Sequence, residues 1–251
     1  MEVDIDKKCP TGIKGFDEIV SGGLPRNRTI LLTGECGTGK TIFATEFIYK
    51  GVTKYNEPGV LVLLEQNPDE FKEDMMEFNF DLEKLEKGKK LIIMNASLRT
   101  LGLGEIAQRD IGEGESYSLL PGEVTLDNLV NVILSAAERI NARRVSIDSL
   151  PALDILMEGK KDVRRMILSM NYKLKESGLT TVLISETDDE HSSTYGVERY
   201  VVDGIIKLYY STIGQSPGRI LTIEKMRKTK HSEDMHSMHF INGEGIEVVQ
   251  N

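Results

Sequence analysis

The stretch Gly34-Glu35-Cys36-Gly37-Thr38-Gly39-Lys40-Thr41 decides the fold, because it fits the pattern G-x-x-x-x-G-K-[ST] at every fixed position. In such a loop the glycines let several backbone N–H groups point at one anion, and the lysine reaches the outer phosphates. The Thr41 hydroxyl is placed to ligate Mg²⁺. We therefore predict that these eight residues and the next one, Ile42, bind the phosphates of a nucleotide.

The residues on both sides of this loop strengthen the match. Residues 29–33 are an apolar run typical of a buried strand, and residues 41–49 carry apolar side chains at helical spacing. The loop thus joins a strand to the N-terminus of a helix, where the partial positive charge favours an anion. A glycine-rich turn without function is the alternative, and it does not explain why strand, loop and helix follow in register.

Composition and charge indicate one α/β domain over residues 1–251. The net charge of −9, from 31 basic and 40 acidic residues, provides no general attraction for a polyanion. No apolar run reaches the roughly 18 residues that a membrane helix needs, and the acidic N-terminus does not resemble a signal peptide. Nucleic-acid and membrane partners are therefore not expected, and the predicted localisation is cytoplasmic.

Three further buried strands are predicted to end at the same edge of the sheet as the loop. They are residues 59–64, which precede Glu65, residues 143–149, which contain Asp148, and residues 180–186, which contain Ser185. Ligands of parallel sheets bind beyond the carboxyl ends of the strands. Glu65 is then a candidate base for the attacking water, Asp148 joins Thr41 at Mg²⁺, and Ser185 lies beside Asp148. An ordinary solvated strand end remains the alternative for Glu65 and Ser185.

The last third of the chain is predicted to form antiparallel hairpins, from residues 204–210, 219–226, 239–241 and 246–249. Continued strand alternation beyond Lys225 would put Lys225, Arg227, Thr229 and His231 on one side. Two cations, a hydroxyl and an imidazole form an anion site there, suited to the nucleotide of a neighbouring subunit. Basic residues that protect an edge strand from aggregation are the alternative.

Helices are predicted over residues 16–20, 69–78, 125–140 and 162–175. Residues 97–123 lack regular periodicity and are rich in glycine and carboxylates. So long a loop in a compact domain is usually functional or mobile, so we predict a mobile rim loop that acts as a lid or partner surface. Simple solvated disorder is the alternative for this segment.

Four separated motifs together resemble the KaiC-like branch of the RecA superfamily of ATPases. They are the segment T-G-I-x-G-F-D-E with G-G-L-P at residues 11–25, the phosphate loop, residues 145–149 and the spacing K-x-R-x-T-x-H at residues 225–231. The resemblance implies a RecA-like core with a mostly parallel sheet, ATP or ADP with Mg²⁺, and a homo-hexamer with an unidentified protein partner. It implies catalytic roles for Lys40, Glu65 and Asp148, and for Lys225 and Arg227 supplied by the adjacent subunit, with Thr229 and His231 contacting the same nucleotide.

The sequence departs from this family at three places. Gln66 stands where the family has a second acidic residue, and Lys228 stands where it has glycine. Arg199 and Tyr200 align with the phosphoacceptor positions of circadian relatives, so autokinase activity is not implied. The first departure puts the rate of hydrolysis in doubt, and the second affects the backbone after Arg227.

Three functions remain open from the sequence. The first is a slow, regulatory ATPase, and the second is a RecA-like recombination mediator that binds DNA. The segment 186–191, which would touch DNA in such a mediator, carries four carboxylates and neither lysine nor arginine, so it would repel phosphates. The third is a scaffold that binds ATP without useful hydrolysis, which only Gln66 supports.

Overall fold

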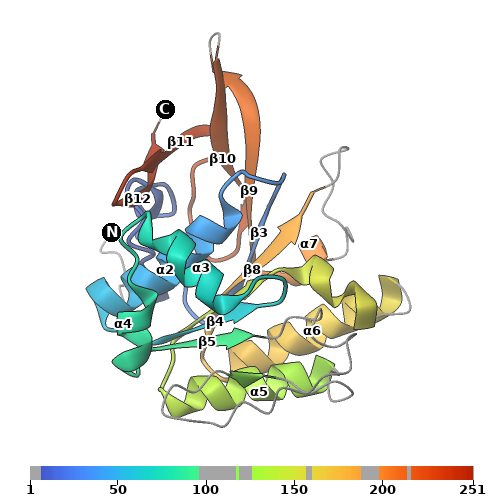
Figure 1. The fold of residues 1–251 in the computed structure, drawn as a ribbon. Coiled ribbons are helices and arrows are strands. Elements are labelled where there is room, and N and C mark those ends of the chain that lie inside the picture. Colours follow the sequence, from blue (N-terminus) through green and yellow to red (C-terminus); the bar gives the residue numbers. More distant parts are fainter. Residues whose placement is uncertain are drawn as a thin grey trace.

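A computed structural model describes residues 7–95, 117–118, 126–156, 160–187, 198–213 and 216–250. Within these ranges ten strands form one sheet, in the order β12-β11-β10-β9-β3-β8-β7-β4-β5-β6 (Figure 1). All pairings from β9 through β3 to β6 are parallel, and those among β9, β10, β11 and β12 are antiparallel. The predicted α/β fold, with a mostly parallel core and antiparallel C-terminal hairpins, is confirmed.

Except for β6, which lies in the segment predicted to be a loop, the parallel strands lie where the sequence has buried apolar runs. The parallel strands are β3 (Thr29–Gly34), β4 (Gly59–Leu63), β5 (Leu91–Asn95), β6 (Tyr117–Ser118), β7 (Arg144–Asp148), β8 (Thr180–Glu186) and β9 (Gly204–Ile213). The antiparallel extension is β10 (Ser216–Met226), β11 (His236–Ile241) and β12 (Gly245–Val249). Two short strands, β1 (Lys8–Cys9) and β2 (Leu24–Pro25), pair separately. Strands buried on both faces need no alternation, so continuous apolar runs identify the central ones.

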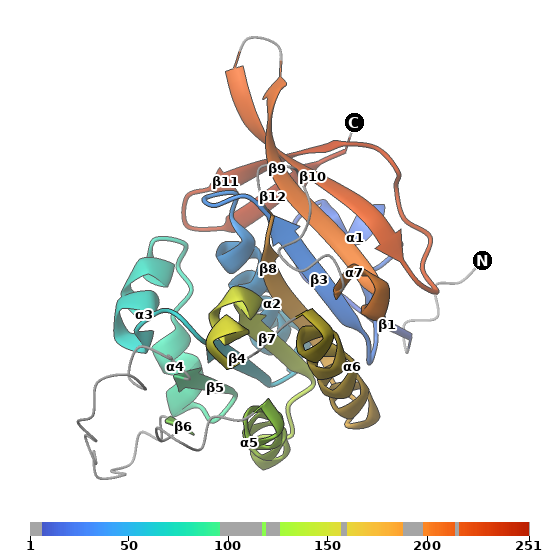
Figure 2. The same cartoon turned by 90° about the vertical axis from the view of Figure 1, so that its right-hand side faces the viewer.

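Helices cover both faces of the sheet (Figures 1 and 2). One face carries α1 (Phe16–Ile19), α2 (Lys40–Tyr55), α3 (Pro68–Met76) and α4 (Leu82–Lys87); the other carries α5 (Leu126–Arg139), α6 (Lys160–Glu176) and α7 (Glu198–Val201). A 3-10 turn, Leu150–Leu156, follows β7. The sheet separates two apolar cores, one around Phe43 and Phe47 and the other around Ile133 and Ile167. Helix α4 has only one buried apolar residue, Leu82, which explains why the pattern did not predict it.

The predicted extension of β10 to His231 is wrong. Strand β10 ends at Met226, and Arg227 and Lys228 form a turn in which Arg227 N donates to Asp203 O at 2.9 Å and Thr229 N to Met226 O at 3.3 Å. Lys228 has a φ of 58°, which lies in the left-handed region that glycine adopts without cost. A left-handed residue stops the alternation of side chains, so Arg227, Thr229 and His231 do not continue one strand face.

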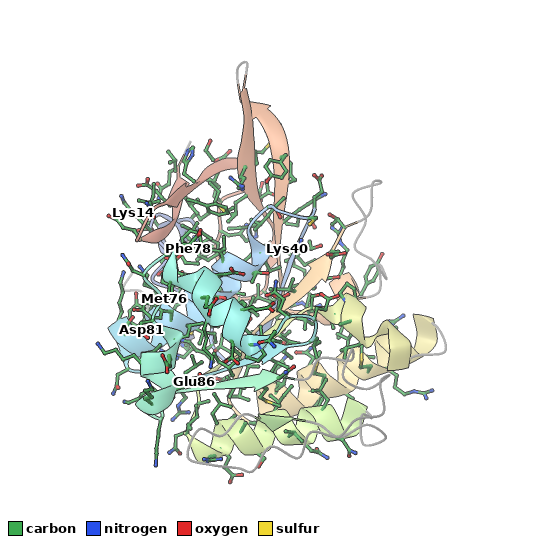
Figure 3. The ribbon with its side chains drawn as sticks, in the orientation of Figure 1. Lys14, Lys40, Met76, Phe78, Asp81 and Glu86 are labelled. Atoms are coloured by element: carbon green, nitrogen blue, oxygen red, sulfur yellow. The ribbon has the colours of Figure 1, made fainter. Side chains whose placement is uncertain are left out.

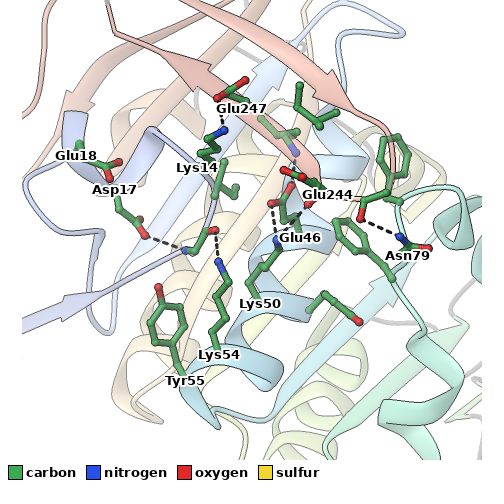
Figure 4. Close-up of a pocket in the computed structure, with 18 residues that line it drawn as sticks. Lys14, Asp17, Glu18, Glu46, Lys50, Lys54, Tyr55, Asn79, Glu244 and Glu247 are labelled. Carbon is green, nitrogen blue, oxygen red and sulfur yellow. Dashed lines mark hydrogen bonds and ion pairs between the residues drawn. The ribbon is translucent and has the colours of Figure 1, made fainter.

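The hairpin of β11 and β12 packs on helix α2 through a buried carboxylate. Glu46 on α2 is 1% exposed, and its Oε2 accepts a hydrogen bond from Ile246 N at 2.7 Å. Lys50 Nζ lies 3.6 Å from Glu46 Oε1 and donates to Glu244 O at 3.1 Å (Figure 4). Gly245, at a φ of 107°, leaves the room that Glu46 needs, because a Cβ there would lie 2.3 Å from Oε2. The helix after the phosphate loop is thus fixed to the C-terminal hairpin.

The predicted rim loop, residues 97–123, lies outside the described residues except for β6, which pairs with β5. Of the segment 186–191, which was expected to repel DNA phosphates, only Glu186 and Thr187 are described. Among the helices that the structure describes, none combines the length and apolar character needed to cross a bilayer.

Candidate nucleotide-binding site

The phosphate loop joins β3 to α2 in the predicted way, with its lysine turned back over the loop. Gly37 and Gly39 have φ values of 75° and 103°, which only glycine adopts freely. Lys40 Nζ donates to the carbonyl oxygens of Gly34 and Glu35, each at 2.8 Å (Figure 3 labels Lys40). The ammonium group is therefore held at the centre of the loop, at the N-terminus of a 16-residue helix whose free amides favour an anion.

The residues predicted to hold Mg²⁺ lie in contact. The Thr41 hydroxyl donates to Asp148 Oδ2 at 2.7 Å, although 107 residues separate them in the sequence. Asp148 ends β7, next to Leu63 at the end of β4. A hydroxyl and a carboxylate side by side are oxygen donors of the kind that Mg²⁺ prefers, so these two residues fit this metal ion. No cluster of three or more His, Cys, Asp or Glu side chains suited to a metal occurs in the described ranges.

Glu65 lies across the cavity from the loop and is oriented by a neighbour. It follows β4 by two residues, is exposed, and its Oε2 accepts a hydrogen bond from Ser149 Oγ at 2.8 Å. Ser149 comes directly after Asp148, so one short segment positions both the carboxylate predicted to bind Mg²⁺ and the candidate base. No motif in the sequence indicated Ser149, because its contact with Glu65 depends on β4 and β7 being neighbours.

These groups line one cavity of about 330 Å³. Its wall contains six residues of the loop and helix start, namely Cys36, Gly37, Gly39, Lys40, Thr41 and Ile42. Glu65 and Asp148 lie opposite, together with Gln66 and Glu186. Gly34, Glu35 and Thr38 do not line it; Gly34 and Glu35 offer carbonyls to Lys40, and the buried Thr38 hydroxyl donates to Glu35 O at 2.8 Å.

The electrostatics of the cavity favour a cation among its carboxylates. Burial, together with the charges of Glu65 and Glu186, raises the pKa of Asp148 to about 6, although the hydrogen bond from Thr41 opposes this rise. Burial also lowers the pKa of Lys40, against the attraction of Glu186 and Asp148. A bound divalent cation would compensate the negative charges that raise the pKa of Asp148.

Ser185 lies beside the cavity and not in its wall. It is fully buried, pairs in register with Thr33 of β3, and its hydroxyl donates to Glu186 O at 3.5 Å. The next residue, Glu186, reaches the cavity instead. A strand exposes alternate side chains, so the sequence places both residues at this edge but does not decide which one faces the ligand.

The outer side of the loop is held by the C-terminal hairpins, which the sequence did not indicate. The Tyr210 hydroxyl donates to Gly37 O at 2.8 Å, and the Arg219 guanidinium lies 4.1 Å from the centre of the Phe240 ring. A Cβ on Gly39 would lie 2.5 Å from Phe240 Cζ. These contacts come from β9, β10 and β11, so the antiparallel extension supports the loop directly.

The residues predicted to act on a neighbour's nucleotide lie near the amino ends of the parallel strands, whereas this cavity lies at their carboxyl ends. Met226 pairs with Gly204, which pairs with Ile30 near the start of β3. Lys225 Nζ donates to Val202 O at 2.6 Å and to Arg199 O at 3.2 Å, so it binds the end of α7.

The other three neighbour-directed candidates have separate contacts. Arg227 lies 3.8 Å from Asp203 and its side chain is 55% exposed. Thr229 Oγ1 accepts a hydrogen bond from Lys8 Nζ at 2.9 Å, and His231 Nδ1 lies 2.9 Å from Ser232 O. Within this chain none of the four lines the phosphate-loop cavity.

Known proteins resemble this chain over nearly its whole length. The family model described as "ATPase: KaiC" matches residues 9–251. The UPF0273 protein MJ1359 of Methanocaldococcus jannaschii is 37% identical over 244 residues, which cover 96% of each chain. The crystal structure of the KaiC-like protein PH0186 from Pyrococcus horikoshii has a TM-score of 0.80 at 34% identity, covering 97% of this chain and 99% of that one.

A longer relative adds to this comparison. The circadian clock oscillator protein KaiC of Thermostichus vulcanus is 36% identical over 242 residues, which are 96% of this chain and 44% of that protein. The chain thus spans less than half the length of the circadian relatives that it matches. The resemblance indicated by the four sequence motifs is confirmed, and the chain belongs to the KaiC family of ATPases.

Proposed function

We propose that this protein is a Mg-ATP-binding homo-hexamer that hydrolyses ATP slowly, with each nucleotide at a subunit interface, and that it serves as a regulatory switch. One observation carries the catalytic part. A phosphate loop with its lysine in place, a hydroxyl–carboxylate pair and a separate oriented carboxylate converge on one cavity of about 330 Å³.

Each group has a definite role in this proposal. Lys40 and the loop amides bind the β- and γ-phosphates, and Thr41 with Asp148 holds Mg²⁺, which neutralises phosphate charge when bound. Glu65 orients the attacking water and accepts its proton. Ser149 is a positioning residue, because it touches Glu65 and lines the cavity behind it.

The neighbour-directed residues complete the proposed site. Lys225, Arg227, Thr229 and His231 lie on the far edge of the sheet from the loop of their own chain, as a residue acting on an adjacent subunit would. Arg227 is the most exposed of the four, and an arginine supplied by a neighbour stabilises the charge of a transferring phosphoryl group. The family motif supports the hexamer.

A scaffold that binds ATP without hydrolysis is the second candidate, and Gln66 favours it. Gln66 lies in the cavity next to Glu65, where the resemblance leads one to expect a second acid. A neutral amide cannot accept a proton from water, so any base function falls to Glu65 alone.

Phosphate release by the Glu65→Gln variant distinguishes the two candidates. For a hydrolase we expect the rate to fall by at least about 100-fold, the usual contribution of a general base, with nucleotide affinity nearly unchanged. Glu70→Gln, at an exposed position on α3, is the matched control and should keep the wild-type rate. Equal, background-level release from wild type and Glu65→Gln would instead identify a scaffold.

A further inference from the structure

A second cavity, of about 660 Å³, opens at the edge of the sheet opposite the phosphate loop. It lies among the turns that lead into β3, β4, β5, β7 and β8. Four cationic side chains line it: Arg26, Lys89, Lys90 and Arg143. They come from three separate turns, so only the parallel sheet brings them together.

The single carboxylate in this wall is already neutralised. Glu57 Oε1 lies 2.6 Å from Arg26, and Glu57 Oε2 lies 2.6 Å from the fully buried Arg144. Two guanidinium groups thus share one carboxylate, which leaves excess positive charge. Lys89 and Arg143 form no ion pair with any carboxylate in the part of the chain that the structure describes.

The amide groups of the wall add further donors. Lys90 Nζ donates to Asn56 Oδ1 at 2.6 Å. Because the oxygen of Asn56 is used in this way, its NH₂ group remains a donor directed elsewhere. Asn27 and Asn141 contribute two more side-chain amides. Because each side-chain amide carries an acceptor oxygen besides its NH₂ group, the excess of donors comes from the four cationic side chains, in a protein whose net charge is −9.

We propose that this cavity binds a small anion that carries a diphosphate group. The volume of the cavity falls within the range of roughly 300–1,000 Å³ that is usual for small-molecule sites. Arginine and lysine are the side chains that bind phosphates most strongly. The four cationic side chains in the wall match a multiply charged ligand, and the inference does not depend on the proposed ATPase function.

Calorimetric titration of inorganic pyrophosphate, and separately of ADP, tests this site in the Lys40→Ala protein, whose phosphate loop is disabled. We expect saturable binding with one ligand per chain. Combining Lys89→Gly with Arg143→Ala should weaken it by at least about tenfold, because each substitution removes a charge-assisted hydrogen bond. Lys89 has a φ of 54°, so glycine removes its side chain without backbone strain.

A matched control separates a specific site from general charge effects. Lys84→Ala with Lys87→Ala removes two exposed lysines of α4, which do not line the cavity, and should leave affinity within twofold. Tighter binding of ADP than of pyrophosphate would assign the site to a nucleotide, and the reverse order would assign it to the inorganic anion. Absence of saturable binding at millimolar ligand, or equal weakening by both double substitutions, would overturn the proposal.

Discussion

Glu46, a buried carboxylate on α2, is expected to make the stability of the protein depend on pH. Burial raises its pKa from 4.5 to about 7, and the hydrogen bond from Ile246 N and the charge of Lys50 only partly oppose this. Between these two values the native chain holds a proton that the unfolded chain has released. The contribution of Glu46 to the free energy of unfolding is therefore fully present below pH 4.5, and it is lost as the pH rises through 7.

The Glu46→Gln variant should lose this pH dependence, because the amide keeps the size and an acceptor for Ile246 N but does not ionise. From pH 5 to pH 8, the free energy of unfolding of wild type should fall relative to the variant by up to about 3 kcal/mol. Urea unfolding at several pH values measures it. Glu244→Gln changes an exposed carboxylate on the same hairpin turn and should follow wild type. Parallel profiles for wild type and Glu46→Gln would contradict the assignment.

Among single residues, the sequence predicted those that we propose to bind phosphate and metal, but not those that contact and orient them. Lys40, Thr41 and Asp148 are indicated by local patterns, and the contact between Thr41 and Asp148 confirms their convergence. Ser149, Glu186 and Tyr210 reach the site through strand neighbours and side-chain direction. Those properties depend on sheet order, which no local pattern contains.

Among the elements, the turn after β10 shows where strand periodicity fails as a guide. Residues 225–231 alternate basic and polar side chains as a strand would, yet the strand ends at Met226. Lys228 adopts a φ of 58°, at the position where the family has glycine. The family pattern thus contained the signal for a left-handed turn, and lysine in this chain concealed it.

Substitution of Lys228 tests the strain of this turn. An L-residue in the left-handed region destabilises the folded chain by roughly 1–2 kcal/mol. Glycine removes this strain, but its greater conformational freedom in the unfolded chain cancels part of the gain. Lys228→Gly should therefore raise the free energy of unfolding by up to about 1 kcal/mol, and Lys228→Val, which is β-branched, should lower it. Urea unfolding of both variants provides the measurement.

A control at the next exposed lysine makes this test specific. Lys230 is exposed and is absent from the residues with positive φ, so Lys230→Gly should give no stabilisation. If glycine stabilises the protein equally at both positions, or if Lys228→Val matches Lys228→Gly, the backbone of the turn is not the cause.

In the whole molecule, two sets of functional groups lie at opposite ends of the parallel strands. The phosphate loop, Asp148 and Glu65 lie at the carboxyl ends of the parallel strands, and Lys225 and Arg227 lie near the amino ends. A site built from both sets needs two copies of the chain, arranged head to tail as in a ring. The mostly parallel character of the sheet was predicted, whereas its strand order was not; the assembly follows only from resemblance and remains a prediction.

Arg227 is the residue best suited to test this assembly. Its side chain is 55% exposed and lies 3.8 Å from the buried Asp203, which keeps Lys175 at 3.0 Å and Arg28 at 3.4 Å without it. Arg227→Ala should therefore fold normally, because two other cations still neutralise Asp203. Lys225→Ala is a poorer probe, since Lys225 binds the end of α7.

Mixed assemblies provide the decisive measurement. Glu65→Gln and Arg227→Ala subunits should each release phosphate far more slowly than wild type when alone. In a random mixture, a site that takes its loop from an Arg227→Ala subunit and its arginine from a Glu65→Gln neighbour is intact. Roughly a quarter of the sites meet this condition in a head-to-tail ring, so the mixture should recover about a quarter of the wild-type rate. Light scattering with Mg-ATP should show one assembly for all three samples. A mixture no faster than the mean of its two components would mean that each chain hydrolyses ATP, if at all, with its own residues alone.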